Sequence, residues 1–96
     1  MNLLTFKEIV LDRDLKMCFV KDAPINLTKA EYLLLEFLLL HRGKVFSRRE
    51  LLNAWTKEVS LRTVDTAISR LRKKLKEYSN YIITRPGFGY GLRDLH

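Results

Sequence analysis

The sequence predicts an α+β fold in which a small antiparallel sheet is followed by three helices and a C-terminal β-hairpin. Three observations support this prediction. Residues 1–27 contain β-branched and aromatic runs separated by polar turns, which is typical of short strands. Residues 28–77 carry helix-starting signals, each followed by apolar residues at helical spacing. Residues 81–93, YIITRPGFGYGLR, place a Pro-Gly turn between two strand-like runs.

The N-terminal strands are expected in the runs LLTFKEIVL and LKMCFVK, which the polar DRD connects tightly. The KDAP segment predicts a second turn, and the INL segment after it predicts a third short strand. Together these runs predict a small antiparallel sheet.

Two capping boxes mark the starts of the first two helices. Thr28 with Glu31, and Ser47 with Glu50, have the spacing at which each side chain hydrogen-bonds the exposed backbone N–H of the other residue. Gly43 supplies a residue that ends the first helix. Because nearly every position in between is apolar, the first helix is expected to be buried on most of its circumference and to form the core.

The first turn of the second helix carries Arg48 and Arg49, although the helix dipole favours acids there. The expected buried stripe of this helix consists of Leu51, Leu52 and Trp55. Backbone N–H groups and guanidinium groups can bind an anion together, so the two arginines favour an anion opposite this helix start. Their simple solvation is the alternative interpretation.

The stretch LRTVDTAISRLRKKLK, residues 61–76, predicts a third helix over 61–77 with Ser60 as its N-cap. One apolar stripe is formed by Val64, Ile68, Leu71 and Leu75. The opposite, polar stripe is formed by Arg62, Thr66, Ser69 and Lys73, and it is flanked by Arg70 and Lys76. From residue 62 to residue 76 there are six Lys and Arg but one acid, Asp65, so this face suits an anionic partner.

The charge of the whole chain is equally one-sided. Residues 1–41 carry five Lys and Arg against six Asp and Glu, a net charge of −1, whereas residues 42–96 carry thirteen against five, a net charge of +8. Such asymmetry indicates nucleic acid or an anionic membrane surface as the partner. A solvated basic surface with no partner is the alternative.

The order of elements favours nucleic acid. Two helices joined by a short loop and followed by a hairpin have the arrangement of a winged helix-turn-helix. Helix 61–77 would then lie in the major groove of double-stranded DNA, with hairpin 81–93 as the wing. Arg62 can reach a base edge or a phosphate, Thr66 and Ser69 are short enough to allow close approach, and Lys73 would meet phosphate.

Other classes of site are not indicated. With Cys18 as its single cysteine the chain has no internal disulfide, which favours a reducing compartment. His41 and His96 lie apart from any Cys or carboxylate cluster, so neither a metal nor another cofactor is expected. The longest apolar run, YLLLEFLLL, contains Glu36 and is about half as long as a bilayer span. We therefore expect a cytoplasmic domain that does not contact the membrane.

The motifs resemble one protein family. RTVDTAISRLRKKL followed by YIITRPGFGYGL is similar to the effector domain of OmpR/PhoB-family bacterial response regulators, and LTKAEYLLLEFLLLHRGKVFSRRELL looks like its first two helices. The resemblance implies a four-stranded N-terminal sheet, three helices and a hairpin wing. It also implies transcriptional regulation through promoter DNA, bound by tandem copies on direct repeats, with the isolated domain monomeric. Residues 1–96 are expected to form this one domain, without the phosphorylatable receiver domain.

The resemblance also assigns site residues. Positions on or beside the DNA-facing helix are matched by Arg62, Thr63, Ser69, Arg70, Arg72 and Lys73. Arg48 matches a phosphate-contacting position, and Thr84 and Tyr90 match wing positions. Arg49 and Thr66, which the helix patterns indicate, and Arg85 of the wing complete the expected DNA-contacting set. The set is Arg48, Arg49, Arg62, Thr63, Thr66, Ser69, Arg70, Arg72, Lys73, Thr84, Arg85 and Tyr90.

Three departures from the family pattern stand out. Pro86 occupies the place of the usual wing arginine and Arg85 comes one residue earlier, so strand alternation is expected to turn Arg85 the other way. Segment 55–62 is shorter than the loop through which several family members touch RNA polymerase, which leaves that contact open. Ala67 replaces a larger, often polar residue, and its methyl group could pack against thymine.

Four other functions compete with DNA binding. GFGYG suggests a nucleotide-binding enzyme, but too few residues follow Gly91 for the helix that such a motif requires. A membrane-surface helix would need its apolar stripe free for lipid, whereas the core requires that stripe. RNA binding lacks an obvious pair of exposed aromatic residues. A protein-interaction domain of the same fold, without DNA binding, is the remaining alternative.

Overall fold

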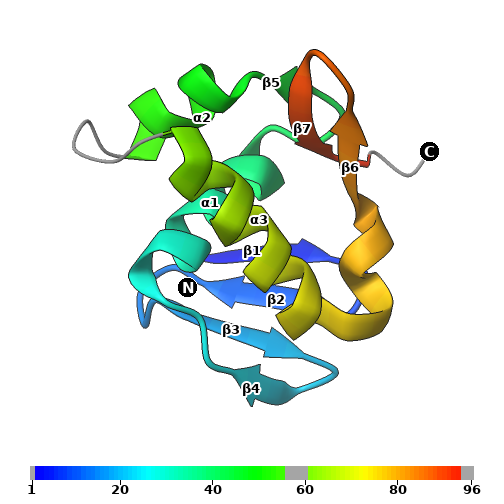
Figure 1. Ribbon diagram of the computed structural model, residues 1–96. Coiled ribbons are helices and arrows are strands. Elements are labelled where there is room, and N and C mark those ends of the chain that lie inside the picture. The colour runs from blue at the N-terminus through cyan, green and yellow to red at the C-terminus, as the bar shows by residue number, and fades with distance from the viewer. Residues whose placement is uncertain (1, 56–60, 94–96) are drawn as a thin grey trace.

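The computed structural model describes residues 2–55 and 61–93, which form two antiparallel sheets, three α-helices and one 3₁₀ helix (Figure 1). The first sheet has the strand order β1-β2-β3-β4. Its strands are β1 (Leu3–Phe6), β2 (Ile9–Asp12), β3 (Met17–Val20) and β4 (Ala23–Ile25). The predicted N-terminal antiparallel sheet is therefore confirmed.

Two strand boundaries differ from the prediction. The run LLTFKEIVL is divided into β1 and β2 by a turn in which Lys7 has a φ of 56°. The strand expected at INL lies two residues earlier, as β4, because Lys21 and Asp22 take φ values of 52° and 64° and form the turn before it. Neither turn contains Gly or Asn, the residues that normally signal a left-handed backbone. The sequence therefore gives no sign of the turn at Lys7, whereas the KDAP segment did predict the turn at Lys21 and Asp22.

The helices α1 (Lys29–Leu40) and α2 (Arg48–Trp55) begin at the two predicted capping boxes. Thr28 Oγ1 accepts a hydrogen bond from Glu31 N at 3.2 Å, and Glu31 Oε1 accepts one from Thr28 N at 2.9 Å. The corresponding bonds at the start of α2 link Ser47 with Glu50 and measure 3.1 and 2.8 Å. Both helix starts are thus set by local sequence.

The end of α1 differs slightly from the expectation. The helix stops at Leu40 with His41 as its C-cap, so Gly43 lies beyond the helix end that it was expected to provide. Gly43 has a φ of 86° and donates its N–H to the carbonyl of Leu92 at 2.8 Å. This glycine therefore connects the end of the first helix to the second sheet.

The third helix, α3 (Leu61–Leu75), buries the predicted apolar stripe. Val64, Ile68, Leu71 and Leu75 are each at most 1% exposed. The helix ends at Leu75, short of the predicted residue 77, because Lys76 takes a φ of 52° and the chain continues as the 3₁₀ helix η1 (Lys76–Tyr81). Lys and Glu are good helix formers, so the sequence gives no sign of this change.

The second sheet has the order β5-β7-β6. Its strands are β5 (Val45–Phe46), β6 (Ile82–Arg85) and β7 (Gly89–Leu92). The predicted hairpin is confirmed as β6 and β7, whereas β5 was not predicted. A Cβ atom on Gly89 would lie 1.9 Å from the carbonyl oxygen of Phe46, so the glycine of GFGYG allows β5 to approach β7 closely.

The core lies between the first sheet and the helices α1 and α3, which cover one face of that sheet (Figure 1). Ile9 and Leu11 of β2 and Leu34, Leu35 and Leu38 of α1 are all at most 1% exposed. Because α3 is anchored through its apolar stripe, its polar stripe faces outward beside the second sheet. The fold therefore holds the basic helix face and the wing together on one side.

Candidate nucleic-acid interface

The outer face of α3 forms the first part of the candidate interface. An open hollow of about 390 Å³ is lined by Arg62, Asp65, Thr66, Ser69, Arg70 and Lys73. Five of these six residues belong to the predicted DNA-contacting set. The hydroxyl of Thr66 donates to the backbone carbonyl of Arg62 at 3.2 Å, so it lies along the helix. Thr66 and Ser69 are short, so the helix face is shallow between the long basic side chains on either side. This shape suits close approach to a groove.

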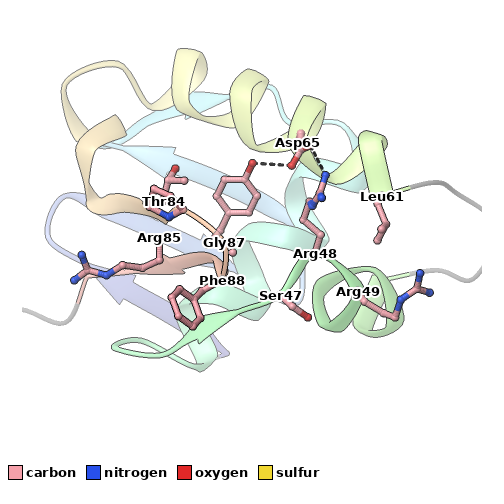
Figure 2. Close-up of a pocket in the computed structure, with 12 residues that line it drawn as sticks. Ser47, Arg48, Arg49, Leu61, Asp65, Thr84, Arg85, Gly87 and Phe88 are labelled. Atoms are coloured by element: carbon pink, nitrogen blue, oxygen red, sulfur yellow. Dashed lines mark hydrogen bonds and ion pairs between the residues drawn. The ribbon is translucent and has the colours of Figure 1, made fainter.

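A second hollow, of about 450 Å³, lies where the start of α2, the start of α3 and the wing meet (Figure 2). Five predicted residues line it, namely Arg48, Arg49, Thr84, Arg85 and Tyr90. Figure 2 shows Arg49 and Arg85 extending outward in opposite directions. The structure thus brings residues from three separate elements to one rim.

Asp65 joins these three elements. Its Oδ2 lies 3.0 Å from a guanidinium nitrogen of Arg48, and its Oδ1 accepts a hydrogen bond from the hydroxyl of Tyr90 at 2.7 Å. Burial raises the pKa of Tyr90 above its ordinary value, and the hydrogen bond to Asp65 raises it further. Tyr90 therefore remains a neutral donor, and one carboxylate ties α2, α3 and β7 together.

Arg72 makes a second connection between α3 and the wing. Its guanidinium donates to the carbonyl of Ile82 at 2.8 Å and to the hydroxyl of Thr84 at 2.7 Å. The same group lies 5.8 Å from the centre of the Tyr90 ring. Two residues that were both expected to contact DNA, Arg72 and Thr84, are thus bonded to each other.

The tip of the wing is a tight turn. Phe88 donates its N–H to the carbonyl of Arg85 at 2.9 Å, and Gly87 has a φ of 84°, as expected for Pro-Gly at the centre of a type II turn. Phe88 is 76% exposed at this tip. Arg85 points away from Asp65 and Arg48 (Figure 2), in line with the strand alternation expected for it.

A family model for the C-terminal domain of transcriptional regulatory proteins matches residues 22–92. The chain belongs to this family. Among similar solved structures is the DNA-binding domain of the response regulator AdeR in complex with an intercistronic region. It is 35% identical with a TM-score of 0.86, and the match covers 96% of this chain and 99% of that one. The family model thus spans β4, the three α-helices and the wing, and the match to the AdeR domain extends over nearly the whole chain.

Two further response regulators have the same fold. The DNA-binding domain of Klebsiella pneumoniae RstA, in complex with the RstA box, is 28% identical with a TM-score of 0.84, and the match covers 97% of this chain and 98% of that one. Thermotoga maritima DrrB, an OmpR/PhoB homolog, is 36% identical with a TM-score of 0.86 over 96% of this chain. The present chain spans 44% of the DrrB chain.

The predicted OmpR/PhoB resemblance and winged-helix fold are therefore confirmed, as is the predicted function of a DNA-binding output domain of a response regulator. The individual DNA-contacting residues stay a prediction. Sequence reasoning missed the role of Asp65 and identified it only as the single acid among six cations. That isolation was the available signal, because an acid retained in a basic face suggests a specific partner.

The expectation for Ala67 was wrong. Ala67 is 6% exposed and belongs to the core, so its methyl group does not face the groove. The reason is helical spacing, because Ala67 follows Val64 by three residues and adjoins Ile68 on the buried stripe. Thr63 is half-buried at the edge of the outer face, and Lys76 lies beyond the end of α3.

Some expectations lie outside the described residues. These are the N-cap role of Ser60, the packing of the Trp55 side chain, and the contact of segment 56–60 with RNA polymerase.

In the part of the chain that the structure describes, no helix is long and apolar enough to cross a bilayer. Within the same residues, no group of three or more His, Cys, Asp or Glu is placed to hold a metal ion. Cys18 is buried, which raises the pKa of its thiol to about 11.

Proposed function

We propose that this domain reads duplex DNA with α3 in the major groove and the wing beside the phosphate backbone. The observation that carries the proposal is the hollow on α3, whose six lining residues are three cations, two hydroxyl residues and Asp65, all from one helix face. The second hollow continues this surface to α2 and the wing. The AdeR and RstA domains, solved in complex with an intercistronic region and with the RstA box, support DNA binding by a domain of this fold.

Base reading is assigned to the outer face of α3. Arg62 and Arg70 are exposed and carry the forked guanidinium that pairs with guanine. Thr66 and Ser69 are short, so they permit the helix backbone to approach the groove floor. Lys73 lies further along the helix and meets a phosphate, which positions the helix without reading sequence.

Backbone contacts are assigned to the second hollow. Arg48 and Arg49 at the start of α2 face one phosphate, where the helix N–H groups add to the attraction. The wing contributes Arg85, which is exposed at the end of β6 and lines this hollow. Arg72, Thr84 and Tyr90 are proposed to support the surface between α3 and the wing, because Arg72 bonds to Thr84 and Tyr90 bonds to Asp65. Thr63 is proposed to contact DNA from the half-buried edge of α3.

The assembly is part of the proposal. We propose that the domain is a monomer when free, that two copies bind direct repeats in a promoter, and that a receiver domain elsewhere in the parent protein controls this binding. RNA polymerase is proposed as a further partner of the DNA-bound domain. No catalytic activity is proposed. Gly89 of GFGYG, the motif that suggested a nucleotide-binding enzyme, packs against the backbone of β5.

The assignment to α3 is tested with two arginine variants. Arg62→Ala and Arg70→Ala should each weaken binding to a duplex enriched from genomic fragments by about 1 to 3 kcal/mol. Fluorescence anisotropy measures the affinity. Arg42→Ala serves as a matched control, because Arg42 is exposed and lies outside both hollows. Unchanged affinity in both α3 variants would contradict the assignment and favour a protein-interaction domain.

A further inference from the structure

Asp65 presents an electrostatic problem for a DNA-binding surface. It lines both hollows, and its side chain is 40% exposed. A carboxylate in that position repels the phosphates of an approaching duplex, and the repulsion is only partly screened by salt at such short range. A residue with this cost needs a compensating effect within the interface.

The two oxygens of Asp65 are used by different elements. One holds Arg48 of α2 at 3.0 Å, and the other holds the Tyr90 hydroxyl of β7 at 2.7 Å (Figure 2). Such charge-assisted hydrogen bonds restrict both partners in direction as well as distance. The side chain of Arg48 is 49% exposed, so the guanidinium is held at the surface and not withdrawn from it.

The wing is fixed on the other side of Tyr90 as well. Arg72 lies seven residues after Asp65 on α3 and bonds to Ile82 and Thr84 of β6, while its guanidinium lies over the Tyr90 ring. The hairpin is thus held to α3 through both of its strands. The angle between the recognition helix and the wing depends on these side chains.

We propose that Asp65 is a positioning residue that determines specificity, an inference that rests on the proposed function. It holds Arg48 and Tyr90 in one arrangement, so that a phosphate backbone is accepted only in the register that also places α3 correctly. A guanidinium has five N–H donors, and those not bonded to Asp65 remain to bind phosphate. A duplex in another register approaches the Asp65 carboxylate without a favourable contact between its phosphate and Arg48, so it binds more weakly.

The test compares affinity for the enriched duplex with affinity for a scrambled duplex in Asp65→Asn. The variant has nearly the same shape but loses the charge and the ion pair. The ratio of the two affinities should fall by about tenfold, the effect of one lost charge-assisted hydrogen bond, while binding to the scrambled duplex becomes stronger. Asp14→Asn is the control, because it removes the same charge in the turn between β2 and β3 and should leave the ratio unchanged.

A second variant separates positioning from charge. Tyr90→Phe retains the ring beneath Arg72 and removes only the hydroxyl that Asp65 accepts, so the ratio should again fall without any change in net charge. Circular dichroism melting would establish that both variants are folded at the temperature of the titration.

Two results would overturn the inference. An equal rise of both affinities in Asp65→Asn would mean that Asp65 only repels DNA, and an equal fall would mean that it only maintains the fold. Failure of the proposed function is distinguishable, because the unmodified domain would then already show no preference for the enriched duplex.

Discussion

At the residue scale, the two glycines of the wing turn differ in what surrounds them. Gly87 has a φ of 84° and nothing within 4 Å of an added Cβ, whereas Gly89 has a φ of 139° and the carbonyl oxygen of Phe46 at 1.9 Å. Gly87→Ala should therefore lower the free energy of unfolding by about 1 kcal/mol through backbone strain alone. Gly89→Ala should lower it by about 2 to 4 kcal/mol, because β5 must also move.

Urea denaturation of both glycine variants measures this difference. Equal losses of stability would contradict the close packing of β5 against β7. The sequence indicated a turn at these glycines but not the neighbour that makes one of them necessary, because β5 is distant in sequence from β7.

Lys73 is expected to behave differently from the arginines of α3. If it contacts phosphate only, Lys73→Ala should weaken binding to enriched and scrambled duplexes alike and reduce the slope of log affinity against log salt by about one unit. Anisotropy titrations at several salt concentrations give that slope. A loss confined to the enriched duplex would show instead that Lys73 reads sequence.

The polar residues of α3 were predictable because helical spacing separates the two faces. Arg62, Thr66, Ser69 and Lys73 are all exposed, as expected. Ala67 was misplaced because the family pattern was followed there in preference to the spacing. The contacts of Asp65 and Arg72 were not predictable, since they depend on where the wing lies relative to the helix.

At the element scale, local signals were sufficient for helix starts and insufficient for several ends. Both capping boxes are satisfied by residues three positions apart, so the sequence contains all that is needed. The end of α3 and the turn between β1 and β2 depend on Lys76 and Lys7, which take positive φ values, and composition gives no indication of either. The strand β5 has two residues and forms only by pairing with β7.

The anchoring of α3 can be tested by truncating its stripe. Leu71 is fully buried, so Leu71→Ala should lower the free energy of unfolding by about 2 to 5 kcal/mol. Ser69→Ala is the control, because Ser69 is exposed on the same helix and the change should have little effect on stability. Thermal melting compares the two variants, and an unchanged melting temperature in Leu71→Ala would undercut the placement of this helix.

At the scale of the whole molecule, one buried ion pair links α1 to α3. Glu31 is 2% exposed, and Lys74 Nζ lies 2.5 Å from its Oε1. Burial alone would raise the pKa of Glu31, but the hydrogen bonds from Lys74 and from the Thr28 backbone outweigh it and lower the pKa below its ordinary 4.5. A carboxyl with a lowered folded pKa stabilises the fold above its unfolded pKa, and that stabilisation is lost as the pH falls.

The domain should accordingly lose stability between about pH 5 and the lowered folded pKa of Glu31. Urea unfolding across this range measures the loss. Glu31→Gln should be less stable at pH 7, because Lys74 loses its partner, but its stability should change less with pH. An identical acid response in both proteins would assign the effect to other carboxyl groups.

The distribution of charge in the chain connects these scales. The basic half of the sequence forms the three elements that surround the two hollows, and the nearly neutral half forms the first sheet and α1. Composition therefore predicted a polyanionic partner and helical spacing predicted which helix faces it. The shape of the complete surface could not be predicted from the sequence, because it depends on how the helices and the wing pack together.

The most direct test of DNA reading is an anisotropy titration of the unmodified domain with an enriched genomic duplex and a scrambled one across a salt series. A sequence-reading domain should bind the enriched duplex more tightly at every salt concentration, and log affinity should fall steeply with log salt. Equal affinity for both duplexes with the same salt dependence would contradict the account. In that case the surface of α3 would be basic without being a reader.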